Sequence, residues 1–199
     1  KVLGEDIGGR EKLPEPKAQK APKQDLFSDP DLFSTQSTTE ETPEAPKNFK
    51  TIHDVEHTYE LIDSEEKINQ LVQALHHTTE FCFDSETTSL DTIVAELVGL
   101  SFSIKAHHAY YVPISSDKET ALKQLEPFRR IFDDTSKTLI GQNIKYDYQV
   151  LLNYNIEIKN KLFDTMVAHF LIMPDMRHNM DVLSQTYLNY APVSIETLI

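Results

Sequence analysis

The stretch FCFDSETTSL, residues 81–90, is an apolar run that ends in two acidic side chains. Residues 81–83 predict a β-strand buried in a sheet, and Cys82 within it is expected to be a buried, inert thiol. Asp84 and Glu86 stand two residues apart, so an extended chain projects both carboxylates from the same face. Like charges held side by side repel each other. The stretch therefore raises the question of what compensates this repulsion.

Strand-like patterns surround this stretch. Runs at 96–104 and 109–114 are joined to it and to each other by short links, which favour antiparallel pairing. Tyr110 and Tyr111 alternate along the second run, so we expect one in the core and one on the surface. A run at 138–142 is reached across a helical segment, and we expect it to pair in parallel.

Helical patterns alternate with these strands. A short strand near residue 60 leads into a helix with an apolar stripe, for which Asp63 is the expected N-cap. Pro127 is expected to kink or split the next helix, and Asp164 and Asp181 are expected N-caps further on. The later helical runs are 119–134, 145–154, 164–173 and 180–188. The order of elements predicts an α/β domain with a mixed central sheet flanked by helices in three layers.

Residues 1–50 are expected to form a disordered interdomain linker ahead of a folded domain at 51–199. They hold six of the ten prolines, three of the five glycines and no tyrosine, and they show no strand or helix period. Residues 26–33, LFSDPDLF, are their one apolar island, interpreted as a transiently packed segment or a docking motif. Because the sequence begins at Lys1, we also expect it to be a piece of a longer protein.

The amino-acid composition limits the kinds of molecule that the chain can bind. The formal net charge is −13, whereas proteins that grip nucleic acid by counterion release are usually basic. The chain must therefore avoid polyanions or reach them through metal ions and a more basic neighbour. The single cysteine cannot form an internal disulfide, which fits a reducing cytoplasm. No apolar stretch approaches the roughly 20 residues of a membrane span, so we expect no membrane partner.

A third carboxylate answers the question raised by the first two. The stretch LIGQNIKYDYQVLL, residues 139–152, places Asp147 in the first turn of a helix that follows a strand. If the two strands are neighbours, Asp147 faces Asp84 and Glu86. Three converging carboxylates suit hard divalent cations such as Mg²⁺ and Mn²⁺, whose charge removes the repulsion. Two such ions, roughly 3.5–4 Å apart, can activate water and stabilise the leaving oxygen in phosphodiester cleavage.

Six motifs carry a family resemblance: FDSETTSLD (83–91), AELVGLSFS (95–103), AYYVP (109–113), GQNIKYD (141–147), FDTMVAHFLI (163–172) and HNMDVLS (178–184). In order and spacing they resemble the 3′→5′ exonuclease domain of bacterial DNA polymerase I, a family-A polymerase. That domain belongs to the ribonuclease H-like, DEDD-type exonucleases. The resemblance covers residues 59–199, and the proline-rich segment then corresponds to the region that joins an upstream 5′-nuclease domain.

The resemblance implies a function and roles for single residues. The expected activity is proofreading hydrolysis at a single-stranded 3′ end of DNA, in replication and repair, for an attached polymerase domain. Asp84, Glu86 and Asp147 match the catalytic ligands of the two metal ions. The expected substrate-binding residues are Leu90 as an apolar wedge and Gln142, Asn143 and Tyr146 in the groove for the last nucleotides.

Two departures from the family pattern bear on activity. The family's third motif, Tyr-x-x-x-Asp, has no match after Asp181, so we expect an incomplete site in these 199 residues. The second apolar wedge, usually aromatic, is matched by Ile195. Two alternatives to the leading interpretation stay open: a ribonuclease D-like 3′→5′ exoribonuclease, and a catalytically inert, structural exonuclease-like domain.

Overall fold

The computed structural model describes residues 48–194. The linker expected at 1–50 and its apolar island at 26–33 therefore lie almost wholly outside the described residues, as does Ile195. Near the start of the described residues, the Lys50 N–H donates to the Asn189 carbonyl at 2.9 Å.

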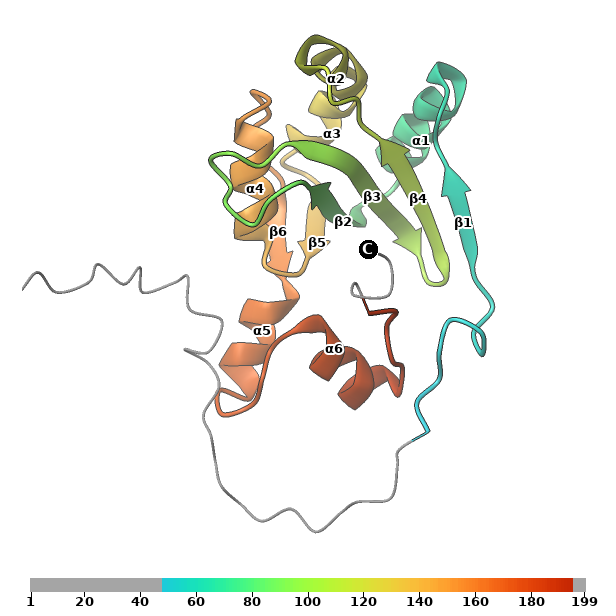
Figure 1. The fold of residues 1–199 in the computed structure, drawn as a ribbon, viewed down its shortest axis with the longest axis vertical. Helices are drawn as coiled ribbons and strands as arrows, with labels where there is room; N and C mark the ends of the chain where they lie inside the picture. The colour runs from blue at the N-terminus through green and yellow to red at the C-terminus, as the bar shows by residue number, and fades with distance from the viewer. Residues whose placement is uncertain (1–47, 195–199) are drawn as a thin grey trace, which may run out of the picture. The chain divides into compact units, whose positions relative to one another are not determined.

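A mixed sheet of six strands forms the centre of the fold (Figure 1). Its strands are β1 (Thr58–Leu61), β2 (Glu80–Thr87), β3 (Leu97–Lys105), β4 (His108–Pro113), β5 (Thr138–Gly141) and β6 (Lys161–Asp164), in the spatial order β1-β4-β3-β2-β5-β6. The pairs β2–β3 and β3–β4 are antiparallel, whereas β1–β4, β2–β5 and β5–β6 are parallel. The antiparallel pairings and the parallel β2–β5 pairing confirm the expectations from the sequence.

Helices flank this sheet on two sides, with α1, α2 and α3 above it and α5 and α6 below it in the view of Figure 1. The helical segments are α1 (Glu65–His77), α2 (Lys118–Leu125), η1 (Glu126–Phe128), α3 (Arg129–Phe132), α4 (Ile144–Leu152), α5 (Thr165–Ile172), α6 (Met180–Leu183) and the π-helical η2 (Ser184–Leu188). The predicted α/β class with a mixed sheet flanked by helices is confirmed. Within residues 48–194, no helix has both the length and the apolar character needed to cross a bilayer.

Local capping and proline signals set several helix ends. Ser64, not the expected Asp63, caps α1 by accepting the Lys67 N–H, and Asp63 instead pairs with the Lys67 ammonium at 2.7 Å. Asn179 rather than Asp181 caps α6. In both cases the cap lies within two residues of the expected one, because neighbouring polar residues compete for the same role.

Pro127 interrupts the helical run 119–134 as expected. It lies at the start of the 3₁₀ turn η1, between α2 and α3. The interruption turns Phe128, Ile131 and Phe132 into the core, where all three side chains are fully buried.

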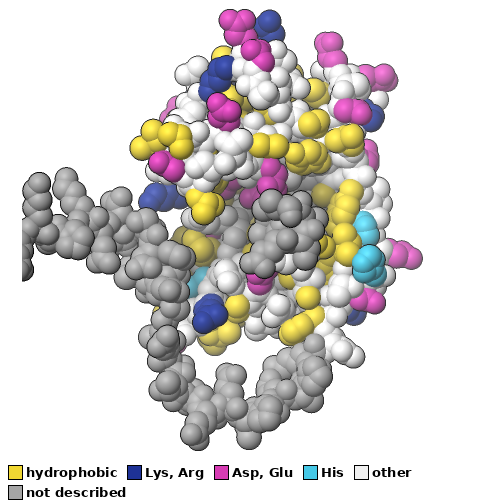
Figure 2. Space-filling view, in the orientation of Figure 1, with side chains coloured by type: hydrophobic (Ala, Val, Ile, Leu, Met, Phe, Trp, Pro, Cys, Tyr) yellow, Lys and Arg dark blue, Asp and Glu magenta, His cyan; other side chains and the backbone are white. Residues whose placement is uncertain are grey.

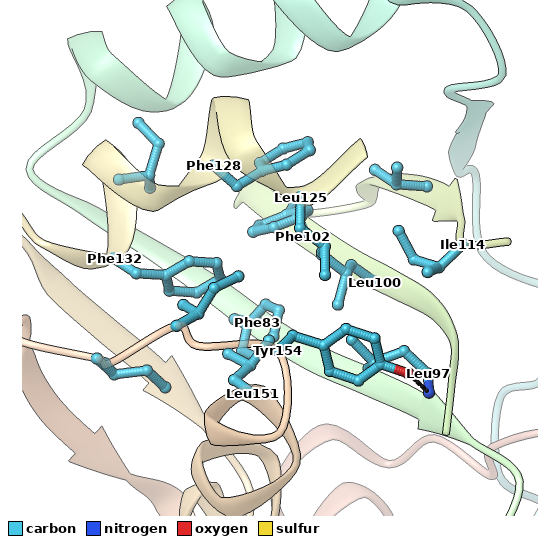
Figure 3. Close-up of a cluster of buried hydrophobic side chains, with 14 of the residues drawn as sticks. Phe83, Leu97, Leu100, Phe102, Ile114, Leu125, Phe128, Phe132, Leu151 and Tyr154 are labelled. Carbon is cyan, nitrogen blue, oxygen red and sulfur yellow. Dashed lines mark hydrogen bonds between the residues drawn. The ribbon is translucent and has the colours of Figure 1, made fainter. Parts of the chain in front are cut away.

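The core lies between one face of the sheet and the helices α1 to α3, with α4 at its end (Figure 3). The rings of Phe102 and Phe128 are stacked with centroids 5.3 Å apart, and Phe83 meets Phe132 edge-on at 5.1 Å. Burying each such ring contributes about 1.5–3 kcal/mol. The Tyr154 hydroxyl accepts the Leu97 N–H at 2.9 Å, which satisfies its polar end at the edge of this cluster (Figure 3).

The opposite face of β2 is exposed. Residues along this strand alternate strictly, so Phe81, Phe83 and Ser85 are buried whereas Cys82 and the acidic side chains at 84 and 86 are exposed. The expectation of a buried Cys82 was therefore wrong. A run of three apolar residues resembles a strand covered on both faces, but among the described residues only one face of β2 is packed into the core.

The sequence did not predict β6. Its four residues, KLFD, pair in parallel with β5, with Gly141 opposite Asp164. Such a short edge strand has too few positions to show a period. Its consequence is that Asp164 and the start of α5 lie beside the turn that follows β5.

Candidate active site

Asp84 and Glu86 project from the exposed face of β2, near its end, as the two-residue spacing predicted. Burial, the Asp147 carboxylate and the Glu86 carboxylate, in that order, raise the pKa of Asp84 from 3.8 to about 6. A carboxyl group with this pKa is partly protonated near neutral pH. The repulsion between carboxylates that the sequence indicated therefore contributes to the raised pKa of Asp84.

Asp147 lies in the first turn of α4 and is buried, with 3% of its surface exposed. One of its carboxylate oxygens accepts the backbone N–H of Ser85 at 2.9 Å and the Ser85 hydroxyl at 2.6 Å. Burial raises the pKa of Asp147, and these two hydrogen bonds oppose that rise. Ser85 lies between Asp84 and Glu86 but points to the other face of β2, so Asp147 approaches the pair from the buried side of the strand.

Ser85 is therefore a site residue that sequence reasoning missed. Its signal was present in the alternation of β2, because a polar side chain between two carboxylates must face the core. A buried hydroxyl needs a hydrogen-bond partner. In the structure this partner is Asp147.

Asp164 joins the start of α4 to the start of α5. Its carboxylate accepts the N–H groups of Asn143 and Ile144 at 3.2 and 2.8 Å, and those of Met166 and Val167 at 2.9 and 3.2 Å. The predicted N-cap is confirmed, and the same carboxylate also caps a second helix. Asn143 lies exposed in this turn with φ of 59°, in the left-handed region that asparagine tolerates.

Gln142 directly follows β5, whose last pairing with β2 joins Ile140 to Cys82. Its side-chain amide is engaged within the protein. The Nε2 atom donates to the His178 carbonyl at 2.7 Å, and the Oε1 atom accepts the Thr165 hydroxyl. Gln142 therefore ties the turn after β5 to α5 and to the segment that precedes α6.

A pair of buried histidines supports the same segment. His169 and His178 face each other through their Nδ1 atoms at 2.6 Å, and His169 also contacts the Tyr187 hydroxyl at 3.0 Å. Only one of two facing Nδ1 atoms can carry the proton in such a hydrogen bond. Among the described residues, the buried Nε2 atom of His178 has no hydrogen-bond partner.

Tyr146 supports the loop that presents Leu90. Its hydroxyl shares a hydrogen bond with the Thr87 hydroxyl and donates to the Ser89 carbonyl, both at 2.5 Å. Leu90 itself is 93% exposed, which is unusual for a leucine and suits an apolar contact with a ligand. Gln149 of α4 and Asn153, directly after α4, hold the same loop by hydrogen bonds to Thr92.

Tyr111 lies on the site face of the sheet, and Tyr110 packs against the core on the other face, as their alternation predicted. Burial and, to a lesser extent, the Glu86 carboxylate raise the pKa of Tyr111. The phenol is therefore protonated at neutral pH and can donate a hydrogen bond.

The donor chemistry of the site fits a hard divalent cation, since carboxylate oxygens are its preferred ligands and a cation would relieve the charge at Asp84. The sequence predicted that Asp84, Glu86 and Asp147 converge on shared ions, but the structure does not bring the three carboxylates together as a metal-binding group. Between residues 48 and 194, no group of three or more His, Cys, Asp or Glu side chains could hold an ion. Basic side chains stand singly among acidic ones on the face drawn in Figure 2.

Similar solved structures define the class of fold. The structure entitled "Brucella melitensis NrnC with bound Mg2+" matches with a TM-score of 0.54 at 19% identity, over 70% of this chain and 65% of that one. Escherichia coli RNase D, described as an exoribonuclease involved in structured RNA processing, matches with a TM-score of 0.52 at 20% identity, over 65% of this chain and 33% of that one. The fold is that of the ribonuclease H-like exonucleases.

The sequence defines the family more narrowly. The model of the 3′-5′ exonuclease family matches residues 59–198, and the chain belongs to this family, the exonuclease domains of family-A DNA polymerases. DNA polymerase I of Borreliella burgdorferi is 31% identical over 171 residues, which span 84% of this chain and 18% of that protein. The chain thus spans less than a fifth of the length of this curated relative.

Proposed function

We propose that the chain is a proofreading module that removes nucleotides from the 3′ end of DNA for an attached DNA polymerase. The observation that carries the proposal is the carboxylate group at the end of β2, where burial and then the Asp147 and Glu86 carboxylates raise the pKa of Asp84 to about 6. Perturbed carboxylates in a nuclease family are the groups that chemistry at phosphodiesters requires.

Asp84 and Glu86, with Asp147, would hold two divalent cations, Mg²⁺ or Mn²⁺. When bound, these ions would supply charge that activates water and stabilises the leaving oxygen. Ser85 contributes orientation, because its two hydrogen bonds fix the Asp147 carboxylate against β2. A third motif, Tyr-x-x-x-Asp, would add a further ligand to these three carboxylates in a longer polymerase chain.

The single-stranded 3′ end would lie over the exposed face of β2. Leu90 would contact the terminal base, since it is 93% exposed on a loop held by α4. Asn143 is exposed in the turn before α4 and is free of the core. Gln142 and Tyr146 would act indirectly, by fixing the segments beside the site, because their polar atoms form hydrogen bonds to His178 and Ser89.

The net negative charge of the chain supports a model in which neighbouring domains make most of the contacts with DNA. With 32 acidic and 19 basic residues, the chain offers few groups that release counterions from DNA. The polymerase and 5′-nuclease domains of a longer chain would supply most of the grip on the duplex, and residues 1–50 would link them to this module. Such an enzyme would act on the bacterial chromosome in the cytoplasm.

The alternative function is 3′→5′ exoribonuclease activity. The match to the RNase D fold favours it, although that likeness concerns the fold alone. The sequence relationship to DNA polymerase I favours DNA. An inert, structural domain is the third possibility, and the three retained carboxylates speak against it.

The test measures release of mononucleotides from 3′-labelled single-stranded DNA and from RNA of the same sequence, with and without Mg²⁺. We expect a longer chain that carries the third motif to degrade DNA faster than RNA, and the 199-residue chain to release little. Asp84→Ala should abolish release, whereas Glu65→Ala, an exposed carboxylate on α1, should leave it unchanged. Faster release from RNA would favour the alternative, and equal activity of Asp84→Ala would refute the site.

A further inference from the structure

Two rows of residues cross the sheet at the carboxylate site. In one row Asp84 of β2 pairs with Ser101 of β3, which pairs with Tyr111 of β4. Residues directly opposite each other in antiparallel strands share a face of the sheet. The Tyr111 side chain therefore lies on the same face as the Asp84 carboxylate, with only a serine between them.

The second row places Gly99 of β3 opposite Glu86 of β2. A Cβ atom built on Gly99 would overlap with the hydroxyl oxygen, Cζ and Cε2 atoms of Tyr111. The tip of the Tyr111 ring thus lies across Gly99 and towards Glu86, in space that any other residue would fill. The Tyr111 ring therefore extends from the row of Asp84 and Ser101 into the row of Glu86 and Gly99.

These rows lie side by side on the site face of the sheet. Asp84 and Glu86 stand on β2, Ser101 and Gly99 lie beside them on β3, and the Tyr111 ring reaches over Gly99 from β4. A ligand that reaches the Asp84 carboxylate across Ser101 therefore meets the phenol on its other side. A phenol hydroxyl at this place is a neutral donor suited to the oxygen atoms of a nucleotide.

We propose that Tyr111 is a further substrate-contacting residue of the exonuclease site, whose hydroxyl donates a hydrogen bond to an oxygen of the terminal nucleotide lying over Ser101, between Tyr111 and Asp84. This inference rests on the proposed function. It assigns Gly99 a role as well, since the absence of a side chain there lets the ring reach the site.

The first test replaces Tyr111 by phenylalanine in the polymerase chain that carries all exonuclease motifs. Loss of one hydrogen bond to a charged or strongly polar group should lower kcat/KM for 3′-terminal hydrolysis by about ten-fold. The matched control is Tyr110→Phe, the next residue on the same strand, whose ring packs against the core on the opposite face. Equal losses in the two variants, or no loss in Tyr111→Phe, would overturn the proposal.

The second test moves the ring without removing it. Gly99→Ala should displace the tip of Tyr111, a mobile end of a side chain, and give a loss similar to that of Tyr111→Phe. If both changes act through the same contact, Gly99→Ala combined with Tyr111→Phe should lose little more than either alone. Fully additive losses would show that Gly99 acts independently of the Tyr111 hydroxyl and would refute its assigned role.

A readout independent of catalysis separates this inference from the proposed function. Single-stranded DNA with a 3′-terminal 5-iodouracil should, on irradiation in EDTA, cross-link to Tyr111 and not to Tyr110. Metal-dependent hydrolysis without a cross-link, and with full activity of Tyr111→Phe, would refute the inference and leave the proposed function intact. A chain that neither cross-links nor hydrolyses DNA would refute both.

Discussion

The Ser85 backbone N–H and hydroxyl both donate to one carboxylate oxygen of Asp147, at 2.9 and 2.6 Å, across 62 positions of the chain. Through this contact α4 is fixed to the strand that carries Asp84 and Glu86. The three carboxylates therefore approach from both sides of β2, and a side chain without charge sets the position of one of them.

Replacing Ser85 by alanine should destabilise the fold. The buried Asp147 carboxylate would lose its hydroxyl donor, its pKa would rise further, and the free energy of unfolding should fall by about 1–2 kcal/mol in urea titrations. Ser136→Ala is a matched control, because Ser136 donates to Asp134 at the same two distances, 2.9 and 2.6 Å, in an exposed turn. A similar loss in both variants would contradict a special role for the buried contact.

The raised pKa of Asp84 predicts a pH-dependent cost to stability. With a pKa of about 6 in the folded protein and 3.8 as its ordinary value, Asp84 keeps a proton that the unfolded chain has released at intermediate pH. Its contribution to stability therefore falls as the pH rises through this window. The free energy of unfolding of Asp84→Asn relative to the unsubstituted chain should increase from about pH 4 to above pH 6.

Urea unfolding of both chains across this range measures the difference and cancels the titration of all other groups. Mg²⁺ added near neutral pH should stabilise the unsubstituted chain more than Asp84→Asn. A difference between the two chains that does not change with pH would show that the pKa of Asp84 is not raised in the folded protein.

The Tyr146 hydroxyl should determine how firmly the Leu90 loop is held. Tyr146→Phe removes its hydrogen bonds to Thr87 and Ser89, while Gln149 and Asn153 still hold the far part of the loop. Hydrogen exchange at the amides next to Leu90 should become about five-fold faster or more, as expected for the loss of one hydrogen bond. Tyr148→Phe on the same helix serves as the control, and unchanged exchange in Tyr146→Phe would argue against this role.

Asp164 should contribute more to stability than an ordinary helix cap. It accepts N–H groups at the start of both α4 and α5, whereas Asp117 caps α2 alone through the N–H of Thr120 at 2.9 Å. Asp164→Ala should therefore cost about 2 kcal/mol or more in free energy of unfolding, against about 1 kcal/mol for Asp117→Ala. The two losses are compared by urea unfolding, and equal values would show that the bond to α4 adds nothing.

Local features of the sequence determined much of this site. The two-residue spacing of Asp84 and Glu86 places them on one face of any strand, and Asp164 before an apolar run marks a helix start. Proline at 127 could not continue a helix, and the structure interrupts the helix there. These features could be predicted because each depends on residues within a few positions of one another.

Only the tertiary structure decided the remaining contacts. Nothing local in the sequence indicates that the partner of the buried Ser85 hydroxyl is Asp147, or that the Tyr111 ring crosses Gly99. Each depends on which strands become neighbours and on which face the helices cover. That choice is made by the summed burial of side chains distant in the chain, so no short stretch contains the information, whereas the backbone geometry of a short stretch is fixed by its own residues.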